Sequence, residues 1–79
     1  MIIFASLLTL STFASDNTYY IDSANTMQDC QINLDSAHTQ YQESPTEFLL
    51  EQNVREDVKN ILGAKWECVA VIVKDEDNQ

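Results

Sequence analysis

MIIFASLLTLSTFAS, residues 1–15, is the stretch on which the fold of this chain depends. It contains no charged side chain, whereas the rest of the chain holds all thirteen Asp and Glu and all four Lys and Arg. Its residues are rich in Ile, Phe, Leu and Thr, and both alternating sets of side chains are largely apolar. This pattern is typical of a strand that is covered on both faces, in the centre of a sheet.

The same stretch has a competing interpretation as an export signal. Its apolar run has the length of a signal sequence core, and Thr12 and Ala14 place small residues before a cleavage point. However, residues 1–15 lack the Lys or Arg that normally opens a signal peptide. The run is also too short and too interrupted by Ser and Thr to span a bilayer comfortably. We therefore predict a first strand and a cytoplasmic protein that does not enter a membrane. A periplasmic or secreted protein is the alternative, if residues 1–14 are a signal peptide.

A second β-prone run follows a short polar segment. Residues 15–17, SDN, have the composition of a hairpin turn, and residues 18–22, TYYID, form the second run. Two such runs joined by a short turn are expected to pair antiparallel as a hairpin. Because successive strand residues point to opposite faces, Tyr19 and Tyr20 should face opposite ways, with one of them exposed.

The next segment has the period of a helix. Its apolar positions recur at intervals of three and four residues, at Met27, Cys30, Leu34, Ala37 and Tyr41. Asn25 and Gln28 are spaced as a capping pair at the start of this helix. A short strand through residues 30–34 is the competing interpretation, but the helical pattern extends much further along the chain.

A second helix start is marked by Ser44-Pro45-Thr46-Glu47, with Ser as the cap and Pro in the first helical position. The expected buried side consists of Phe48, Leu50, Val54, Val58, Ile61 and Leu62. Gly63 is placed to end the helix in the left-handed conformation. Asn53 and Glu56 are placed to cap a further helix, so residues 45–62 form either one helix or two.

The clearest strand of the sequence is residues 66–74. Its two faces are both apolar, with Val69, Val71 and Val73 on one and Trp66, Cys68, Ala70 and Ile72 on the other. A strand of this kind lies inside a sheet or at a covered interface. The resulting order, β-β-α-α-β, predicts one small α+β domain over residues 1–74, made of an N-terminal β-hairpin, two helices and a C-terminal strand. Residues 75–79 are expected to form an acidic flexible tail.

The charge of the chain narrows the choice of partner. A net charge of -9 repels nucleic acid, so direct binding of DNA or RNA is not expected. The acidic surface instead suits a protein with a basic surface, including one whose groove normally holds nucleic acid. Solubility alone is the alternative reason for such a charge. The candidate partner-binding residues are the carboxylates Glu47, Glu51, Glu56 and Asp57, with Tyr19 and Tyr20 as aromatic anchors.

These carboxylates also have a purely structural interpretation, as a solvated helix surface on which Glu51 pairs with Arg55 one turn later. His38, the only histidine, has no Ser or Cys beside it in a nucleophile arrangement, and no His/Cys cluster provides metal ligands. We therefore predict no enzyme activity, no metal and no cofactor.

The expected redox state of the two cysteines depends on how residues 1–15 are interpreted. In an exported protein Cys30 and Cys68 would form one disulfide that joins the first helix to the last strand. In the cytoplasm they would be buried thiols, since each belongs to an apolar pattern. The strand interpretation favours the thiols.

Three short segments resemble a group of small prophage-encoded proteins of enterobacteria whose function is uncharacterised. The matching positions are Met1–Leu10, Tyr20–Asp22 and Thr26–Cys30, and Glu67–Val69 is also similar. Related members have a cysteine in the first hairpin, where this chain has Ser11 and Ser15. The resemblance implies a phage or prophage origin and the bacterial cytoplasm, and it transfers no catalytic residue.

Two hypotheses of function follow. The first is a small acidic phage accessory protein that binds and inhibits a host or bacterial defence protein by presenting carboxylates in place of nucleic acid. The alternative is an exported inhibitor or immunity protein with one disulfide, which binds a basic hydrolase. A homodimer is compatible with both, because short chains with exposed sheet edges gain burial by pairing.

Overall fold

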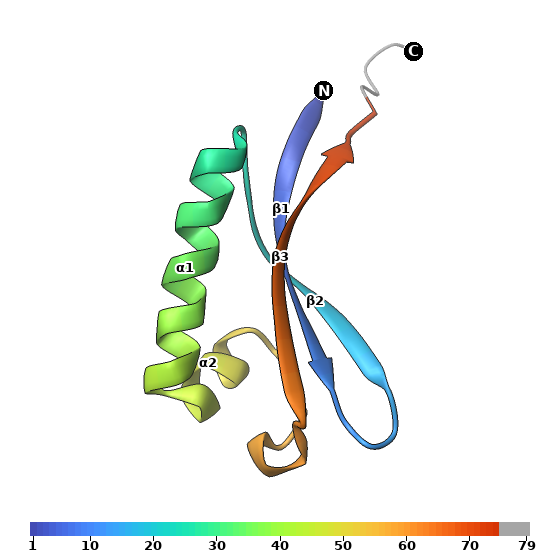
Figure 1. Cartoon of the computed structure of the whole chain (residues 1–79), viewed down its shortest axis with the longest axis vertical. Coiled ribbons are helices and arrows are strands. Elements are labelled where there is room, and N and C mark those ends of the chain that lie inside the picture. The colour runs from blue at the N-terminus through green and yellow to red at the C-terminus, as the bar shows by residue number, and fades with distance from the viewer. Residues whose placement is uncertain (75–79) are drawn as a thin grey trace.

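The computed structural model describes residues 1–74 as a three-stranded antiparallel sheet with helices on one face (Figure 1). The elements are β1 (Ile2–Ser11), β2 (Asp16–Ala24), α1 (Met27–Glu43), α2 (Pro45–Glu51), the short 3-10 helix η1 (Val58–Asn60) and β3 (Gly63–Ile72). The predicted α+β architecture of a hairpin, two helices and a C-terminal strand is confirmed. The predicted acidic tail, residues 75–79, lies outside the described residues.

The opening stretch of the sequence is the central strand of the sheet. The strand order is β2-β1-β3, and β1 runs antiparallel to both neighbours. Leu8, at the middle of β1, is opposite Tyr19 of β2 and Trp66 of β3. The prediction of a first, central strand is therefore confirmed. If residues 1–14 were removed, β2 and β3 would lose the strand that connects them.

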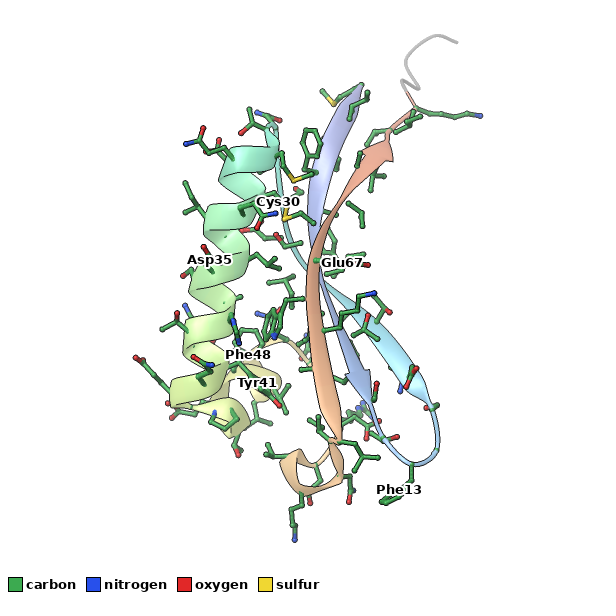
Figure 2. All side chains as sticks on the ribbon, in the orientation of Figure 1. Phe13, Cys30, Asp35, Tyr41, Phe48 and Glu67 are labelled. Carbon is green, nitrogen blue, oxygen red and sulfur yellow. A yellow bond between two sulfur atoms is a disulfide. The ribbon has the colours of Figure 1, made fainter. Side chains whose placement is uncertain are left out.

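The hairpin turn lies earlier than the sequence suggested. Residues 12–15 form it, with the Thr12 N–H donating to the Ser15 carbonyl at 2.9 Å, and Asp16 already belongs to β2. The Thr12 hydroxyl accepts hydrogen bonds from the N–H groups of Ala14 and Ser15, which stabilises the turn at residues 12–15. The predicted turn at residues 15–17 is therefore wrong in position. Phe13 protrudes from the turn (Figure 2).

Helix α1 follows the predicted apolar stripe from Cys30 onward, but Met27 is exposed and the helix begins with a different cap. Cys30, Leu34 and Ala37 are buried, and Tyr41 is half-buried. The cap is Thr26, whose hydroxyl accepts a hydrogen bond from the Asp29 N–H at 3.1 Å. The predicted capping pair, Asn25 and Gln28, is therefore wrong by one residue. The Thr26 hydroxyl bonds the free Asp29 N–H at the start of the helix instead.

The second helical segment is broken. Helix α2 ends at Glu51, and Asn53 adopts a left-handed conformation with φ of 60°. The Val54 N–H then donates to the Leu49 carbonyl at 2.9 Å, which closes the last turn. Residues 45–62 are therefore one short helix followed by a loop and η1, which decides the alternative that the sequence left open.

The buried side chains of this segment also differ from the predicted set. Leu50 is 68% exposed and Leu49 is buried in its place. Leu62 is exposed as well, and it lies beyond η1, where its N–H donates to the Ser11 carbonyl at 2.7 Å. Gly63 is the first residue of β3 and has no positive φ, so the prediction that it ends a helix in the left-handed conformation is wrong.

Strand β3 lies at an edge of the sheet. It pairs with the whole length of β1, from Ile2 opposite Ile72 to Ser11 opposite Gly63. Within residues 1–74 no strand lies on its other side. The interpretation of this segment as a strand is confirmed, but its two apolar faces do not result from a position inside the sheet.

The core lies between the sheet and the two helices. It consists of Leu8, Leu10, Ala37, Phe48, Leu49 and Val54, with Trp66 and Tyr41 packed against it. The ring of Trp66 lies 5.8 Å from that of Tyr41 and 6.0 Å from that of Phe48, measured between centroids. These aromatic contacts fix α2 and the end of α1 against β3. Neither helix of residues 1–74 has the length and hydropathy needed to cross a bilayer.

Candidate functional site

The carboxylates are distributed unevenly over the chain. Residues 1–54 contain no Lys or Arg. Their acidic side chains are all exposed, at Asp16, Asp22, Asp29, Asp35, Glu43, Glu47 and Glu51. The two ion pairs found within residues 1–74 are those of Asp57 with Lys59 and of Glu67 with Lys65, so none of these earlier carboxylates has a basic partner there. The hairpin and the helices therefore present an uncompensated negative surface.

Three of these carboxylates border one hollow. It lies where α1 meets α2, has a volume of about 210 Å³, and is lined by Gln40, Glu43, Ser44, Glu47, Phe48 and Glu51. We call it the acidic hollow. The chain turns at Ser44, whose N–H donates to the Gln40 carbonyl at 2.9 Å and whose carbonyl accepts from the Phe48 N–H at 2.9 Å. This turn brings the last residue of α1 close to the first turn of α2.

Packing below the hollow holds its shape. Phe48 is buried, and its ring meets that of Tyr41 edge-on at a centroid distance of 6.0 Å. The two helices are thereby joined through their apolar sides, while their carboxylates remain in solvent. This packing fixes the backbone positions from which the carboxylates of the acidic hollow project.

Helix dipoles make two of the three positions unfavourable for folding. Glu43 lies in the last turn of α1 and Glu51 in the last turn of α2, and neither turn contains a basic residue. A carboxylate at the carboxyl end of a helix faces the negative end of the dipole, at a cost of typically about 0.3–1 kcal/mol. Glu47, in the first turn of α2, is placed favourably. Glu43 and Glu51 are therefore placed against the dipoles of their helices, and Glu47 is placed with that of α2.

The predicted carboxylates separate into two groups. Glu47 and Glu51 border the acidic hollow, whereas Glu56 and Asp57 lie beyond the break, beside Leu50 and Val58. Asp57 accepts a hydrogen bond from the Lys59 N–H at 3.1 Å and lies 4.0 Å from the Lys59 ammonium. Asp57 therefore caps η1, and neither Glu56 nor Asp57 lines the acidic hollow.

The expected surface pair of Glu51 with Arg55 does not form among the described residues. The pair required a continuous helix, in which positions four apart are neighbours. Because α2 ends at Glu51, Arg55 is not on the next turn. Glu51 is thus left without the basic neighbour that the sequence implied.

The two tyrosines lie on opposite faces of the sheet, as predicted. Tyr19 is half-buried and packs against the core, opposite Leu8. Tyr20 is 59% exposed on the face away from the helices, opposite Leu7. Neither lines the acidic hollow, so Tyr20 belongs to a separate surface.

Sequence reasoning missed Glu43 as a member of the site. A signal was present, since Glu43, Glu47 and Glu51 follow each other at intervals of four. Pro45 interrupts that interval, and the spacing implies a shared face only within one helix. Only the angle between α1 and α2 brings the three together.

Cys30 and Cys68 are joined by a disulfide, with their Cα atoms 6.2 Å apart (Figure 2). The prediction of two separate core thiols is therefore wrong. Cys30 lies on the buried side of α1, and Cys68 points from β3 to the same side, so the two meet across the layer. The Ser6 hydroxyl is buried beside them, 3.3 Å from the Cys30 sulfur. The structure thus combines a first strand at residues 2–11 with a disulfide, so these two features are not alternatives.

His38 lies on the exposed side of α1, where its ring centroid is 5.1 Å from that of Trp66. Among residues 1–74 no group of three or more His, Cys, Asp or Glu is arranged to hold a metal ion. His38 is thus part of the aromatic packing at the surface.

No protein-family model, curated protein or solved structure matches this chain.

Proposed function

We propose that this protein is a non-catalytic inhibitor that binds a basic surface of another protein through its acidic hollow. The observation that carries the proposal is the group of exposed carboxylates in residues 1–54, which have no Lys or Arg among them. Such a surface attracts a basic protein over several ångströms and raises the rate of encounter. The same charge opposes direct binding of nucleic acid.

The hollow suits an inserted Arg or Lys. Glu43, Glu47 and Glu51 offer acceptor oxygens around one cavity, which the buried Phe48 also borders. A guanidinium fits this arrangement, because its planar group of N–H donors bonds carboxylates in pairs. Binding would relieve the repulsion among the three carboxylates, which the free protein does not neutralise.

The partner is a host or bacterial defence protein, and the proposed compartment is the bacterial cytoplasm. The resemblance of the hairpin and the start of α1 to small prophage-encoded proteins supports a phage origin. A protein that normally holds nucleic acid in a basic groove is the partner class that the charge fits best. In that groove, the carboxylates of α1 and α2 would stand in place of phosphates.

The test uses charge-neutral variants in a capture from bacterial lysate. We expect the wild-type protein to retain a basic protein, and Glu43→Gln/Glu47→Gln/Glu51→Gln to retain at least about tenfold less of it. The matched control, Asp16→Asn/Asp22→Asn/Asp35→Asn, removes the same charge away from the acidic hollow and should retain it as the wild type does. Added duplex DNA should compete for the partner.

Equal losses in the two triple variants would show that total charge, rather than the acidic hollow, carries binding. Capture of no basic protein, or of one that DNA does not displace, would contradict the nucleic-acid mimicry.

A second candidate is supported by the Cys30–Cys68 disulfide. Structural disulfides persist in oxidising compartments, so this bond favours an exported inhibitor or immunity protein acting on a basic hydrolase. Such a protein would keep residues 2–11, because they form the central strand. The intact mass of the natively expressed protein and its cell fraction separate the two candidates. Periplasmic protein that lacks two hydrogens but retains β1 would support export, and reduced cytoplasmic protein would support the first proposal.

A further inference from the structure

The two outer edges of the sheet are protected to different degrees. The β2 edge carries the exposed carboxylates Asp16 and Asp22 and has an irregularity where Ser6 pairs with Asp22 and Leu7 with Tyr20. Charges and bulges are the features by which edge strands avoid pairing with other chains. The β3 edge pairs regularly with β1 over its whole length and has no such irregularity.

The backbone groups of β3 that remain free can be identified. Val73 and Met1 exchange backbone hydrogen bonds, with the Val73 N–H donating at 2.8 Å and the Met1 ammonium at 3.4 Å. Pairs of this kind alternate along an antiparallel ladder, so the odd-numbered residues of β3 face β1. The N–H and C=O groups of the even-numbered residues from Ala64 to Ile72 therefore point to the open edge.

The distal half of this edge is apolar on both faces. Ile72 is 78% exposed, and its partner on β1, Ile2, is 56% exposed. The opposite face carries Val69 and Val71, of which Val71 is also exposed. The sequence pattern predicts a strand covered on both faces, whereas Ala70, Val71 and Ile72 are exposed within residues 1–74.

Charge selects the partner for this edge. From Cys68 to Val73 the strand carries no charged side chain, and Glu67 is paired with Lys65 at 3.6 Å. Residues 68–73 therefore offer no carboxylate to a basic partner. A second copy of this chain has -9 net charge and is repelled by most of the surface, but not by this segment.

We propose that β3 pairs antiparallel with β3 of a second copy, forming a six-stranded sheet in the order β2-β1-β3-β3-β1-β2. A two-fold axis near Ala70 places Val69 opposite Val71 of the second copy, and Cys68 opposite its Ile72. Cross-strand pairs of β-branched residues stabilise such a sheet. The assembly closes, because both edges that remain are the protected β2 strands.

The test measures the mass of the full oxidised chain by sedimentation equilibrium over a wide range of concentrations. We expect a dimer of the 9.0 kDa chain. Ala70→Pro removes an N–H that points to the open edge and leaves the hydrogen bonds to β1 in place. By symmetry it removes two hydrogen bonds, so the dissociation constant should rise at least about tenfold.

Ile72→Lys is a second variant, since it places like charges at the interface from a side chain that is already exposed. It should weaken the dimer at least about tenfold as well. Ile32→Lys, at a 58% exposed position on α1, is the matched control and should dimerise like the wild type. Circular dichroism should show that each variant keeps its secondary structure.

A wild-type protein that stays monomeric at every concentration would overturn the proposal. So would a dimer that neither β3 variant weakens, or assembly into species larger than a dimer, because the two-fold pairing leaves no further open edge.

Discussion

Individual side chains of β1 connect the three strands to the helices. Leu8 and Leu10 are fully buried, and Leu8 has an aromatic neighbour on each side, Tyr19 of β2 and Trp66 of β3. The alternation in the sequence was sufficient to predict which residue types are buried here. It did not indicate which alternating set faces the helices, since both sets are apolar.

Leu8→Ala should lower the free energy of unfolding by about 2–5 kcal/mol, because it opens a cavity at the centre of the core. In a domain of this size that loss approaches the whole stability. Urea unfolding followed by Trp66 fluorescence would measure it. Leu50→Ala, at the exposed position of α2, should change stability by less than about 0.5 kcal/mol. An equal loss in both variants would contradict the placement of Leu8 in the core.

At the scale of elements, α1 is attached to the sheet by apolar packing and by one covalent bond. Its buried side is predictable from the period of Cys30, Leu34 and Ala37, which is a local property. That Cys30 meets Cys68 is not local, because it depends on β3 lying next to β1. The end of α2 was equally hard to predict, since Val54 continues the helical period although Asn53 has already left the helix.

Reduction of the disulfide should lower the free energy of unfolding by about 2–4 kcal/mol, because it frees a long loop in the unfolded chain. Urea unfolding of the same preparation with and without a reductant measures the difference. The variant Cys30→Ala/Cys68→Ala lacks the bond and should show no response to the reductant. A wild-type midpoint that does not move on reduction would show that the bond contributes nothing to stability.

At the scale of the whole molecule, the charged surface and the uncharged edge of the sheet lie in different places. The acidic hollow and the exposed carboxylates belong to the hairpin and the helices, whereas the uncharged half of β3 lies at one edge of the sheet. We propose a basic partner for the first surface and a second copy of the chain for the other. Net charge could be counted from the sequence, but its division between surfaces could not.

Added salt should raise the melting temperature of the protein, since it screens repulsion among carboxylates that have no basic partner. The Debye length falls from roughly 30 Å at 0.01 M to about 10 Å at 0.1 M, so most of the rise should occur in this range. Thermal unfolding by circular dichroism would measure it. Glu43→Gln/Glu47→Gln/Glu51→Gln should show a smaller rise than the wild type. Equal salt responses would indicate that the acidic hollow is not a centre of repulsion.

The sequence by itself determined the features that depend on neighbouring residues: the alternation of β1, the helical period of α1 and the start of α2 at Ser44-Pro45. Only the tertiary structure decided that Cys30 and Cys68 are bonded, that Glu43 joins Glu47 and Glu51, and that β3 lies at an edge. The physical reason is the distance along the chain over which each kind of interaction acts. Backbone preferences and side-chain periods act within a few residues, whereas strand order and helix angle result from the packing of segments far apart in the chain.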